Sequence, residues 1–141
     1  MENWAKKSVI NLIRAAHRVE EQLHACLREY ALTVPQFNVL RILRGQKEQP
    51  VSLATVQDRM VKKMSNTSRL IDKLIDKQLV SRKICPENRR KVDICITPKG
   101  LDLLQKLDPI IDTTEKQIIA GMPANDIQIL NNLLQKFSNQ H

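Results

Sequence analysis

Residues 65–100, SNTSRLIDKLIDKQLVSRKICPENRRKVDICITPKG, change their hydrophobic periodicity twice. Residues 65–78 carry apolar pairs every three to four positions, the stripe of an amphipathic helix. Residues 79–85 and 92–96 are rich in β-branched side chains that partly alternate with polar ones, which predicts the two strands of a hairpin. The Thr-Pro pair that follows can cap and begin another helix. The stretch therefore predicts helix, hairpin, helix.

The predicted hairpin separates apolar from charged side chains. Alternation directs three residues toward the core: Val92, Ile94 and Ile96. Asp93 and Cys95 then point outward. Three adjacent cations fall in the loop at the tip between the strands: Arg89, Arg90 and Lys91.

The residues before position 65 predict three more helices. Residues 5–29 have the apolar spacing of a long amphipathic helix. Thr33 and Gln36 are spaced as a capping box for a second helix that can end at Gly45. Ser52 can cap a short third helix. Only about four turn residues separate that helix from the one that begins near Ser65, which is typical of a helix-turn-helix.

After the hairpin, residues 98–118 and 127–137 have the apolar spacing of two further amphipathic helices, separated by a turn in residues 120–126. The first of them is expected to kink or break at Pro109. The fold class is mainly α with a small β-hairpin wing. We expect residues 1–141 to form a single domain. In it a winged helix-turn-helix lobe, residues 32–100, is flanked by long terminal dimerisation helices in residues 1–31 and 101–141.

The charge of the chain is unevenly placed. The net charge is +8, and residues 59–99 hold twelve Lys or Arg against four Asp or Glu. The other hundred residues hold eleven of each kind. A basic segment in an otherwise balanced chain indicates a surface that binds a polyanion, although a solvated face that binds nothing would look the same.

Residues 65–100 resemble the MarR (multiple-antibiotic-resistance regulator) family of bacterial transcription regulators. The family's usual run is Arg-Leu-x-Asp-x-Leu, Gly-Leu-Val/Ile-x-Arg, Asp-x-Arg and Leu/Ile-Thr-x-x-Gly. The residues in register with it are Arg69, Leu70, Asp72, Leu74, Leu79, Val80, Arg82, Arg90, Ile96, Thr97 and Gly100. The chain departs from this pattern twice, with Asn88 at the usual acid of the wing and Gln78 at the usual glycine after the helix. Gln78 must therefore accept a helix-ending conformation at some cost.

The resemblance implies a homodimer that binds a palindromic operator in double-stranded DNA. Side chains at the start of the recognition helix would meet base edges or phosphates: Ser65, Asn66, Thr67, Ser68 and Arg69. Ser65 could instead cap the helix, and Arg69 could pair with Asp72 or Asp76. Arg90 aligns with the family's minor-groove arginine, with Arg89 and Lys91 beside it. Further phosphate contacts are Lys62, Lys63 and Arg82.

The resemblance also implies a repressor released by a small aromatic or lipophilic effector. The pocket would lie among the first, second and fifth helices, where His17, Tyr30 and Phe37 are candidates. Thiol oxidation at Cys26, Cys85 or Cys95 is the lesser alternative, since buried thiols are usually inert. Neither a metal site nor a cofactor is expected, because His17 and His24 lack further ligands nearby.

Other classes of protein fit less well. An enzyme would need a nucleophile–base set or a phosphate cradle, and the three glycines form no such motif. A winged helix that binds a protein or RNA remains open, but residues 59–99 contain no aromatic residue to stack on bases. With no apolar run of membrane-spanning length and no apolar segment after the first residues, we expect a cytoplasmic protein.

Overall fold

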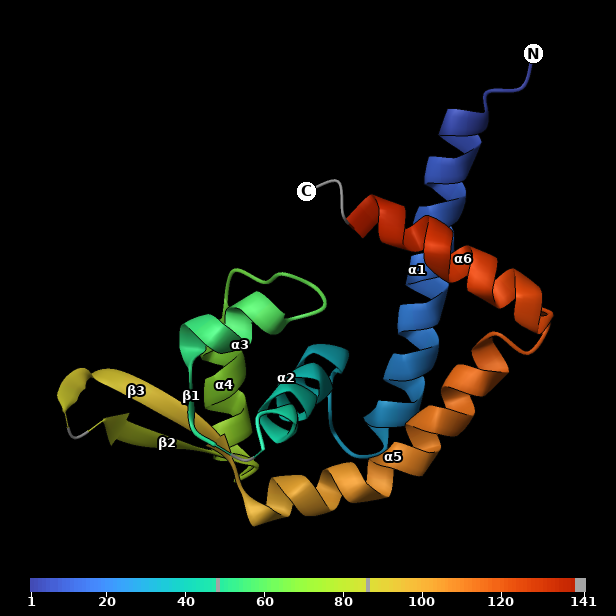
Figure 1. Cartoon of the computed structure of the whole chain (residues 1–141). Helices are drawn as coiled ribbons and strands as arrows, with labels where there is room; N and C mark the ends of the chain where they lie inside the picture. The colour runs from blue at the N-terminus through green and yellow to red at the C-terminus, as the bar shows by residue number, and fades with distance from the viewer. Residues whose placement is uncertain (48, 86, 139–141) are drawn as a thin grey trace.

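The structure, a computed structural model, describes residues 1–47, 49–85 and 87–138, and of residues 85 and 88–91 it describes the backbone only. Figure 1 shows a lobe built from α2, α3, α4 and a small sheet, with α1 and α6 standing beside it and α5 running from one part to the other. The elements in chain order are α1 (Trp4–Arg28), α2 (Val34–Gly45), β1 (Val51–Ser52), α3 (Leu53–Arg59), α4 (Thr67–Asp76), β2 (Val80–Cys85), β3 (Asn88–Ile96), α5 (Pro98–Ile118) and α6 (Ala124–Ser138). The predicted winged helix-turn-helix is confirmed.

Aliphatic side chains make the core of the lobe. Leu40 and Leu43 of α2, Leu74 of α4, Ile94 of β3 and Leu104 of α5 are all buried in one cluster. This placement follows from the three-to-four spacing of the helices and the alternation of β3. The recognition helix α4 and strand β3 of the wing therefore pack into the same buried cluster as α2 and α5.

Three helix starts are capped as the sequence predicts. The Thr33 hydroxyl accepts the Gln36 N–H at 3.2 Å, and the Gln36 side chain accepts the Thr33 N–H at 3.1 Å, which completes the capping box. Ser52 accepts the Thr55 N–H at 3.2 Å at the start of α3. Thr97 accepts the Gly100 N–H at 3.1 Å at the start of α5. Each cap satisfies a backbone donor that the helix cannot.

The sheet has three antiparallel strands in the order β1-β3-β2. The sequence did not reveal β1, because two residues are too few to show a period of two. Ile94 and Ile96 are buried as predicted, but the prediction for Val92 is wrong, since Val92 is 37% exposed. The physical reason is register. β1 pairs only with Ile94 and Asp93 of β3, so Val92 and its partner Ile84 lie in the two-stranded part of the sheet beyond β1.

The three adjacent basic residues of the wing belong to a strand and not to a loop. Cys85 pairs with Asn88, and β3 begins at Asn88. The backbone of Arg89, Arg90 and Lys91 therefore belongs to the first residues of β3, not to a loop between the strands. Their side chains lie outside the described part of the structure.

The end of α4 confirms the helix-ending conformation predicted for Gln78. Its φ angle is +65°, in the left-handed region that favours glycine. The Gln78 N–H donates to the Ile75 carbonyl at 2.8 Å, and the Leu79 N–H donates to the Leu74 carbonyl at 3.0 Å. This pair of bonds is a Schellman motif, and the buried Leu74 and Leu79 accompany it. The Schellman bonds thus form even though Gln78, and not glycine, occupies the left-handed position.

Replacing Gln78 with glycine should therefore stabilise the protein. We expect Gln78→Gly to raise the free energy of unfolding by about 0.5–1 kcal/mol, because glycine adopts this φ angle without strain. Urea denaturation at fixed protein concentration measures the change. The control is Gln105→Gly in the exposed middle of α5, which should lower the stability by about 1 kcal/mol. A loss of stability in both variants would contradict the account of Gln78.

Helix α5 continues through Pro109, so of the two predicted outcomes the break does not occur. Figure 1 shows that the two halves of α5 run in different directions, as expected when a proline removes one backbone bond of a helix. The helix packs against both α2 and α1. α5 is therefore the element that joins the winged lobe to the terminal helices.

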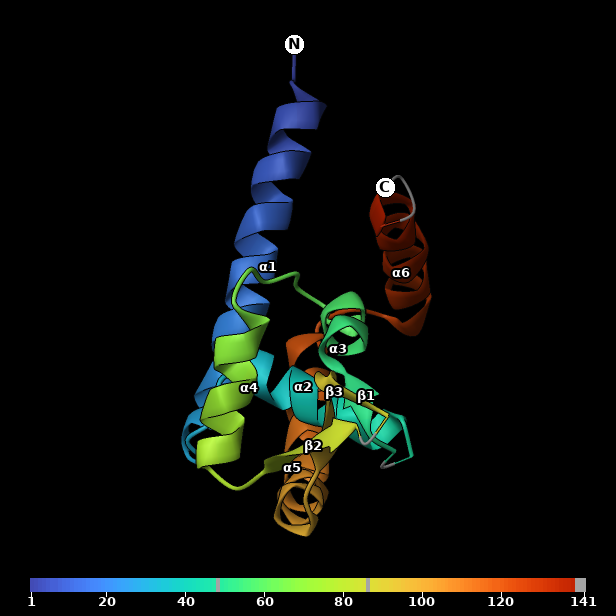
Figure 2. The same ribbon diagram turned by 90° about the vertical axis from the view of Figure 1, so that its left-hand side faces the viewer.

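The two terminal helices have little cover within the chain. Leu27 is the single buried residue of α1, and α6 has none among its described residues. Figure 2 shows α1 and α6 standing apart for much of their length. Among the described residues, no helix is long and apolar enough to cross a membrane. The apolar faces of α1 and α6 are thus exposed in the single chain.

Candidate nucleic-acid interface and effector pocket

The recognition helix begins two residues later than the sequence predicted. α4 starts at Thr67, and Asn66 occupies the capping position without a side-chain capping bond. Ser65 precedes the helix, so it does not cap it. The Asn66 side chain is exposed and its amide is not engaged at the helix start, which leaves donor and acceptor atoms for a base edge.

The expectation that Thr67 faces a nucleic acid needs correction. Thr67 is 1% exposed, and its hydroxyl donates to the Met64 carbonyl at 3.4 Å. The apolar stripe of α4 turns this position inward together with Leu70 and Ile71. Ser68 and Arg69 are exposed on the other side of the same turn. The exposed residues at the start of α4 are thus Ser65, Asn66, Ser68 and Arg69.

Arg82 joins the wing to the recognition helix. Its guanidinium forms an ion pair with the Asp72 carboxylate of α4. Arg82 was expected to contact phosphate, and Asp72 was one of the candidate partners for Arg69. The pairing seen here gives Arg82 a positioning role, because a fork-shaped guanidinium holds a carboxylate in a defined direction.

The turn between α3 and α4 is held by bonds to two helices. The Val61 N–H donates to the Asn38 side chain of α2 at 2.8 Å. The Lys63 ammonium donates to the carbonyls of Gln57 and Asp58, at 3.2 and 2.8 Å. Lys63 therefore satisfies the C-terminal end of α3, where positive charge is favoured, and its phosphate contact stays a prediction.

Lys62, in the same turn, forms an ion pair with Glu20 in the middle of α1. The nitrogen–oxygen distance is 3.6 Å. Figure 1 shows the α3–α4 turn reaching toward α1, and Figure 2 shows it beside that helix. The sequence offered no signal for this contact, because the two residues are far apart along the chain and both lie on polar surfaces.

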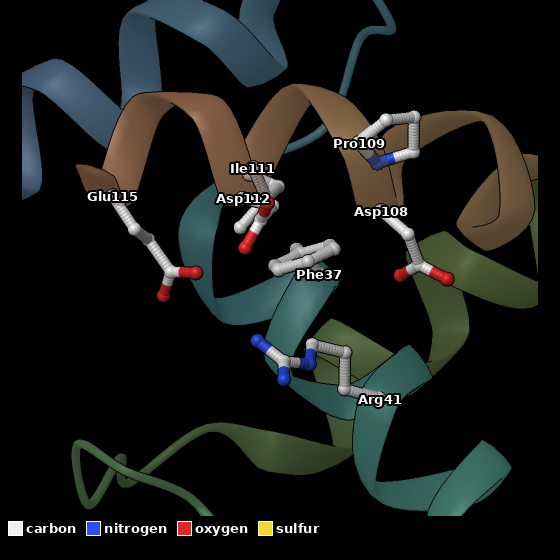
Figure 3. Close-up of a pocket in the computed structure, with 7 residues that line it drawn as sticks. All are labelled: Phe37, Arg41, Asp108, Pro109, Ile111, Asp112 and Glu115. Atoms are coloured by element: carbon white, nitrogen blue, oxygen red, sulfur yellow. The ribbon is translucent and has the colours of Figure 1, made fainter. Parts of the chain in front are cut away.

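A pocket of about 420 Å³ opens between α2 and α5. Its lining residues are Phe37, Arg41, Asp108, Pro109, Ile111, Asp112 and Glu115. Figure 3 shows the Phe37 ring between Arg41 below and the α5 side chains above. The Arg41 guanidinium lies 5.5 Å from the centre of that ring. The pocket is thus lined by one cation and several carboxylates around a largely buried aromatic ring.

Of the three residues expected at an effector site, Phe37 lines this pocket. His17 and Tyr30 lie outside it, so their role at an effector site stays a prediction. His17 is exposed on α1 and pairs with Glu21 one turn later at 3.0 Å. Sequence reasoning missed Arg41, although its position one turn after Phe37 places the two on one face of α2.

Asp108, at the edge of the pocket, is tied to α2. The Arg44 guanidinium donates two hydrogen bonds to its carboxylate, at 2.8 and 3.0 Å. These bonds, with the charges of Arg44 and Arg41, hold the pKa of Asp108 below its ordinary value of 3.8, while desolvation acts in the opposite direction. The pair bridges the lobe and α5.

This ion pair should make stability depend on acid. A lowered pKa in the folded state means that the contribution is complete above pH 3.8 and is lost as the pH falls through the lowered folded value. We expect Asp108→Asn to reduce the free energy of unfolding by about 0.5 kcal/mol at neutral pH, since the pair is largely exposed. Denaturation at pH 7 and below pH 3.8 should show this difference shrinking in acid. Asp112→Asn is the control, because Asp112 pairs with exposed Lys116 on the same helix.

The cysteines and histidines are side chains of the kind that can bind a metal. No group of three or more possible metal ligands exists among the described residues. Cys26 is half-buried and its thiol donates to the Leu23 carbonyl at 3.1 Å. Cys95 is half-buried on β3, and the side chain of Cys85 lies outside the described part of the structure.

The chain is similar to known transcription regulators along most of its length. Residues 32–92 match the MarR family model. The HTH-type transcriptional regulator MhqR of Bacillus subtilis is 25% identical over 130 residues, 92% of this chain and 88% of that protein. The solved structure of BpsR from Bordetella bronchiseptica, described with regulation of its DNA binding by 6-hydroxynicotinic acid, is 25% identical. It has a TM-score of 0.86 over 98% of this chain and 97% of that one. A transcription factor from Planctomyces limnophilus is 27% identical, with a TM-score of 0.76 over 96% and 98%.

Proposed function

Because residues 32–92 place this chain in the MarR family of transcription regulators, we propose that it is a dimeric repressor that binds a palindromic operator and is released by a small ligand. The observation that carries the DNA-binding part is the exposed start of α4, with Asn66 and Arg69, together with a wing in which three cations directly follow the first residue of β3. The chain's whole excess charge belongs to residues 59–99, which include both elements.

The proposed division of labour on DNA follows from exposure and charge. Asn66 and Arg69 would read base edges in the major groove, since an amide suits adenine and a guanidinium suits guanine. Ser65 and Ser68, with the helix N-terminus, would contact phosphate. Arg90, flanked by Arg89 and Lys91, would enter the minor groove from the wing.

The terminal helices support a dimer. Apolar side chains are exposed along them and in the turn between α5 and α6: Trp4, Val9, Ile10, Ile13, Val19, Ile119, Met122, Ile129, Leu133, Leu134 and Phe137. An apolar groove of about 610 Å³ lies between α1 and α6. Exposed apolar side chains around such a groove are typical of an interface, and a two-fold dimer would present two recognition helices to a palindrome. Residues 1–31 and 101–141 would form the dimer base and residues 32–100 the lobe, within a single domain and in the cytoplasm.

The α2–α5 pocket is the proposed effector site. It lies where the lobe meets α5, so a ligand there can favour one orientation of the lobe over another. The Phe37 ring suits a small aromatic molecule. The BpsR structure, with its regulation by 6-hydroxynicotinic acid, offers a relative whose effector is of this kind. Thiol oxidation has less support, because Cys26 is half-buried and hydrogen-bonded.

Selection of duplex DNA from a random pool at two salt concentrations tests the proposal. A dimeric regulator should enrich a palindrome whose half-sites lie about one helical turn apart. Binding that falls steeply with salt but enriches no motif would remove sequence specificity from the proposal. Failure to bind any duplex at low salt would overturn it.

Two substitutions should separate base reading from phosphate binding. Arg90→Ala should weaken binding on all sequences and reduce the salt slope by about one per subunit, because Arg90 would interact with DNA through its charge.

Asn66→Ala should reduce discrimination between the operator and altered sites by about 1–3 kcal/mol. Titration of each variant against operator and scrambled duplexes measures both. Equal losses of Asn66→Ala on every duplex would show that Asn66 only positions the helix.

A further inference from the structure

The α3–α4 turn carries a cation that has two possible anionic partners. Lys62 lies between the short helix α3 and the exposed start of α4, where DNA would approach if the proposed function holds. In the structure its ammonium is 3.6 Å from the Glu20 carboxylate of α1. Glu20 belongs to a terminal helix outside the winged lobe, so an acid from the dimer base faces the proposed DNA side of the lobe.

The turn is built so that Lys62 stays within reach of Glu20. Asn38 accepts the Val61 N–H at 2.8 Å, which fixes the backbone next to Lys62. Lys63, the following residue, is bound to the C-terminal carbonyls of α3. Of the two adjacent lysines, one thus closes a helix end and the other projects toward α1.

The pair is weak enough to be displaced. The side chains of Lys62 and Glu20 are 73% and 50% exposed, so water and salt screen their attraction. A DNA backbone presents a denser array of negative charge than a single carboxylate. A phosphate that approaches Lys62 must also approach Glu20, which repels it.

From these contacts we propose that Glu20 competes with DNA phosphate for Lys62 and thereby lowers the DNA affinity of the protein. The Glu20 carboxylate of α1 reduces the attraction between Lys62 and the DNA backbone. The inference rests on the proposed function, because it concerns the strength of DNA binding. It assigns a role in that binding to a residue outside the winged lobe.

The test compares two neighbouring acids. Glu20→Gln removes the competitor and should tighten binding to a duplex by about two- to fivefold per subunit, the range expected for one exposed ion pair. It should also steepen the salt slope by up to about 0.9 per subunit, because Lys62 becomes free to neutralise one more phosphate. Glu21→Gln is the matched control, since it removes the same charge from the next residue, which pairs with His17 instead.

A double-mutant cycle with Lys62→Met isolates the pair. Lys62→Met alone should weaken binding, and Glu20→Gln added to it should give no further gain. Equal effects of Glu20→Gln and Glu21→Gln would overturn the inference, as would a gain that persists without Lys62. Circular dichroism melting of each variant confirms that folding is unchanged. If the unaltered protein binds no duplex at all, the proposed function is refuted, and the inference with it.

Discussion

Gly100→Ala is expected to lower the free energy of unfolding by about 3 kcal/mol, at the upper end of the cost of overfilling a core. A Cβ atom at this position would lie 2.4 Å from the Leu79 carbonyl oxygen and 2.7 Å from Cγ1 of Ile96. Neither neighbour can move easily. The Leu79 carbonyl accepts the Thr97 N–H at 3.1 Å, and Ile96 is buried at the end of β3.

The close approach at Gly100 has a structural purpose. Gly100 is the third residue of α5, and its N–H is bound by the Thr97 cap. The absence of a side chain lets α5 start directly against the residues that follow α4. A larger residue would push α5 away from Leu79 and Ile96, which would change the position of the recognition helix relative to α5.

Urea denaturation at one protein concentration measures this effect, since the stability of a dimer depends on concentration. Gly45→Ala is the matched control. A Cβ atom at Gly45 meets nothing within 4 Å. Gly45 does not have a positive φ angle, so alanine, which has the higher helix propensity, fits the last residue of α2. Gly45→Ala should therefore be neutral or stabilising. Similar losses in the two variants would show that steric contact is not what selects glycine at position 100.

Leu133→Asp is expected to convert the proposed dimer to a monomer and to weaken operator binding by about 100-fold or more, because paired half-sites are then no longer bound together. Leu133 is 49% exposed in the single chain and lines the groove between α1 and α6. Burying a carboxylate in an apolar interface costs far more than an exposed charge does. A monomer then binds one half-site without the high effective concentration of a linked second one, a loss of about 10²–10⁴ in affinity.

Sedimentation equilibrium and operator titration together measure this result. Asn132→Asp is the control, because it places the same charge on the preceding residue of α6, away from the apolar stripe. That variant should stay dimeric and bind the operator normally. A Leu133→Asp protein that remains dimeric would contradict the proposed interface. A monomer with unchanged operator affinity would show instead that dimerisation does not contribute to binding.

The secondary structure was largely predictable because its signals are local. Thr33, Ser52 and Thr97 cap helices through bonds to residues three positions away, so their spacing in the chain is sufficient to recognise them. The left-handed conformation of Gln78 was predictable for the same reason, since it ends a helix whose apolar stripe is visible in the sequence. The excess charge of residues 59–99 depends on residue identities alone, so counting them is enough to locate it.

The errors share a different origin. Thr67 was expected at the surface because it is polar, but the packing of α4 on the lobe turned it inward. Val92 was expected in the core because it alternates with Ile94, but β1 is too short to cover it. The ion pair of Arg82 with Asp72 of another element was not expected either, whereas the phosphate contact of Arg82 stays a prediction. In each case the deciding contact comes from another element of the fold.

The sequence by itself therefore determined the order of elements, their caps, and the segment that carries the excess positive charge. Tertiary structure alone decided the α2–α5 pocket, how far β1 pairs along β3, and the pairing of Lys62 with Glu20. The physical reason is the range of the interactions. Periodicity and capping depend on residues within about one helical turn, whereas pockets and ion pairs between elements depend on how separate surfaces meet.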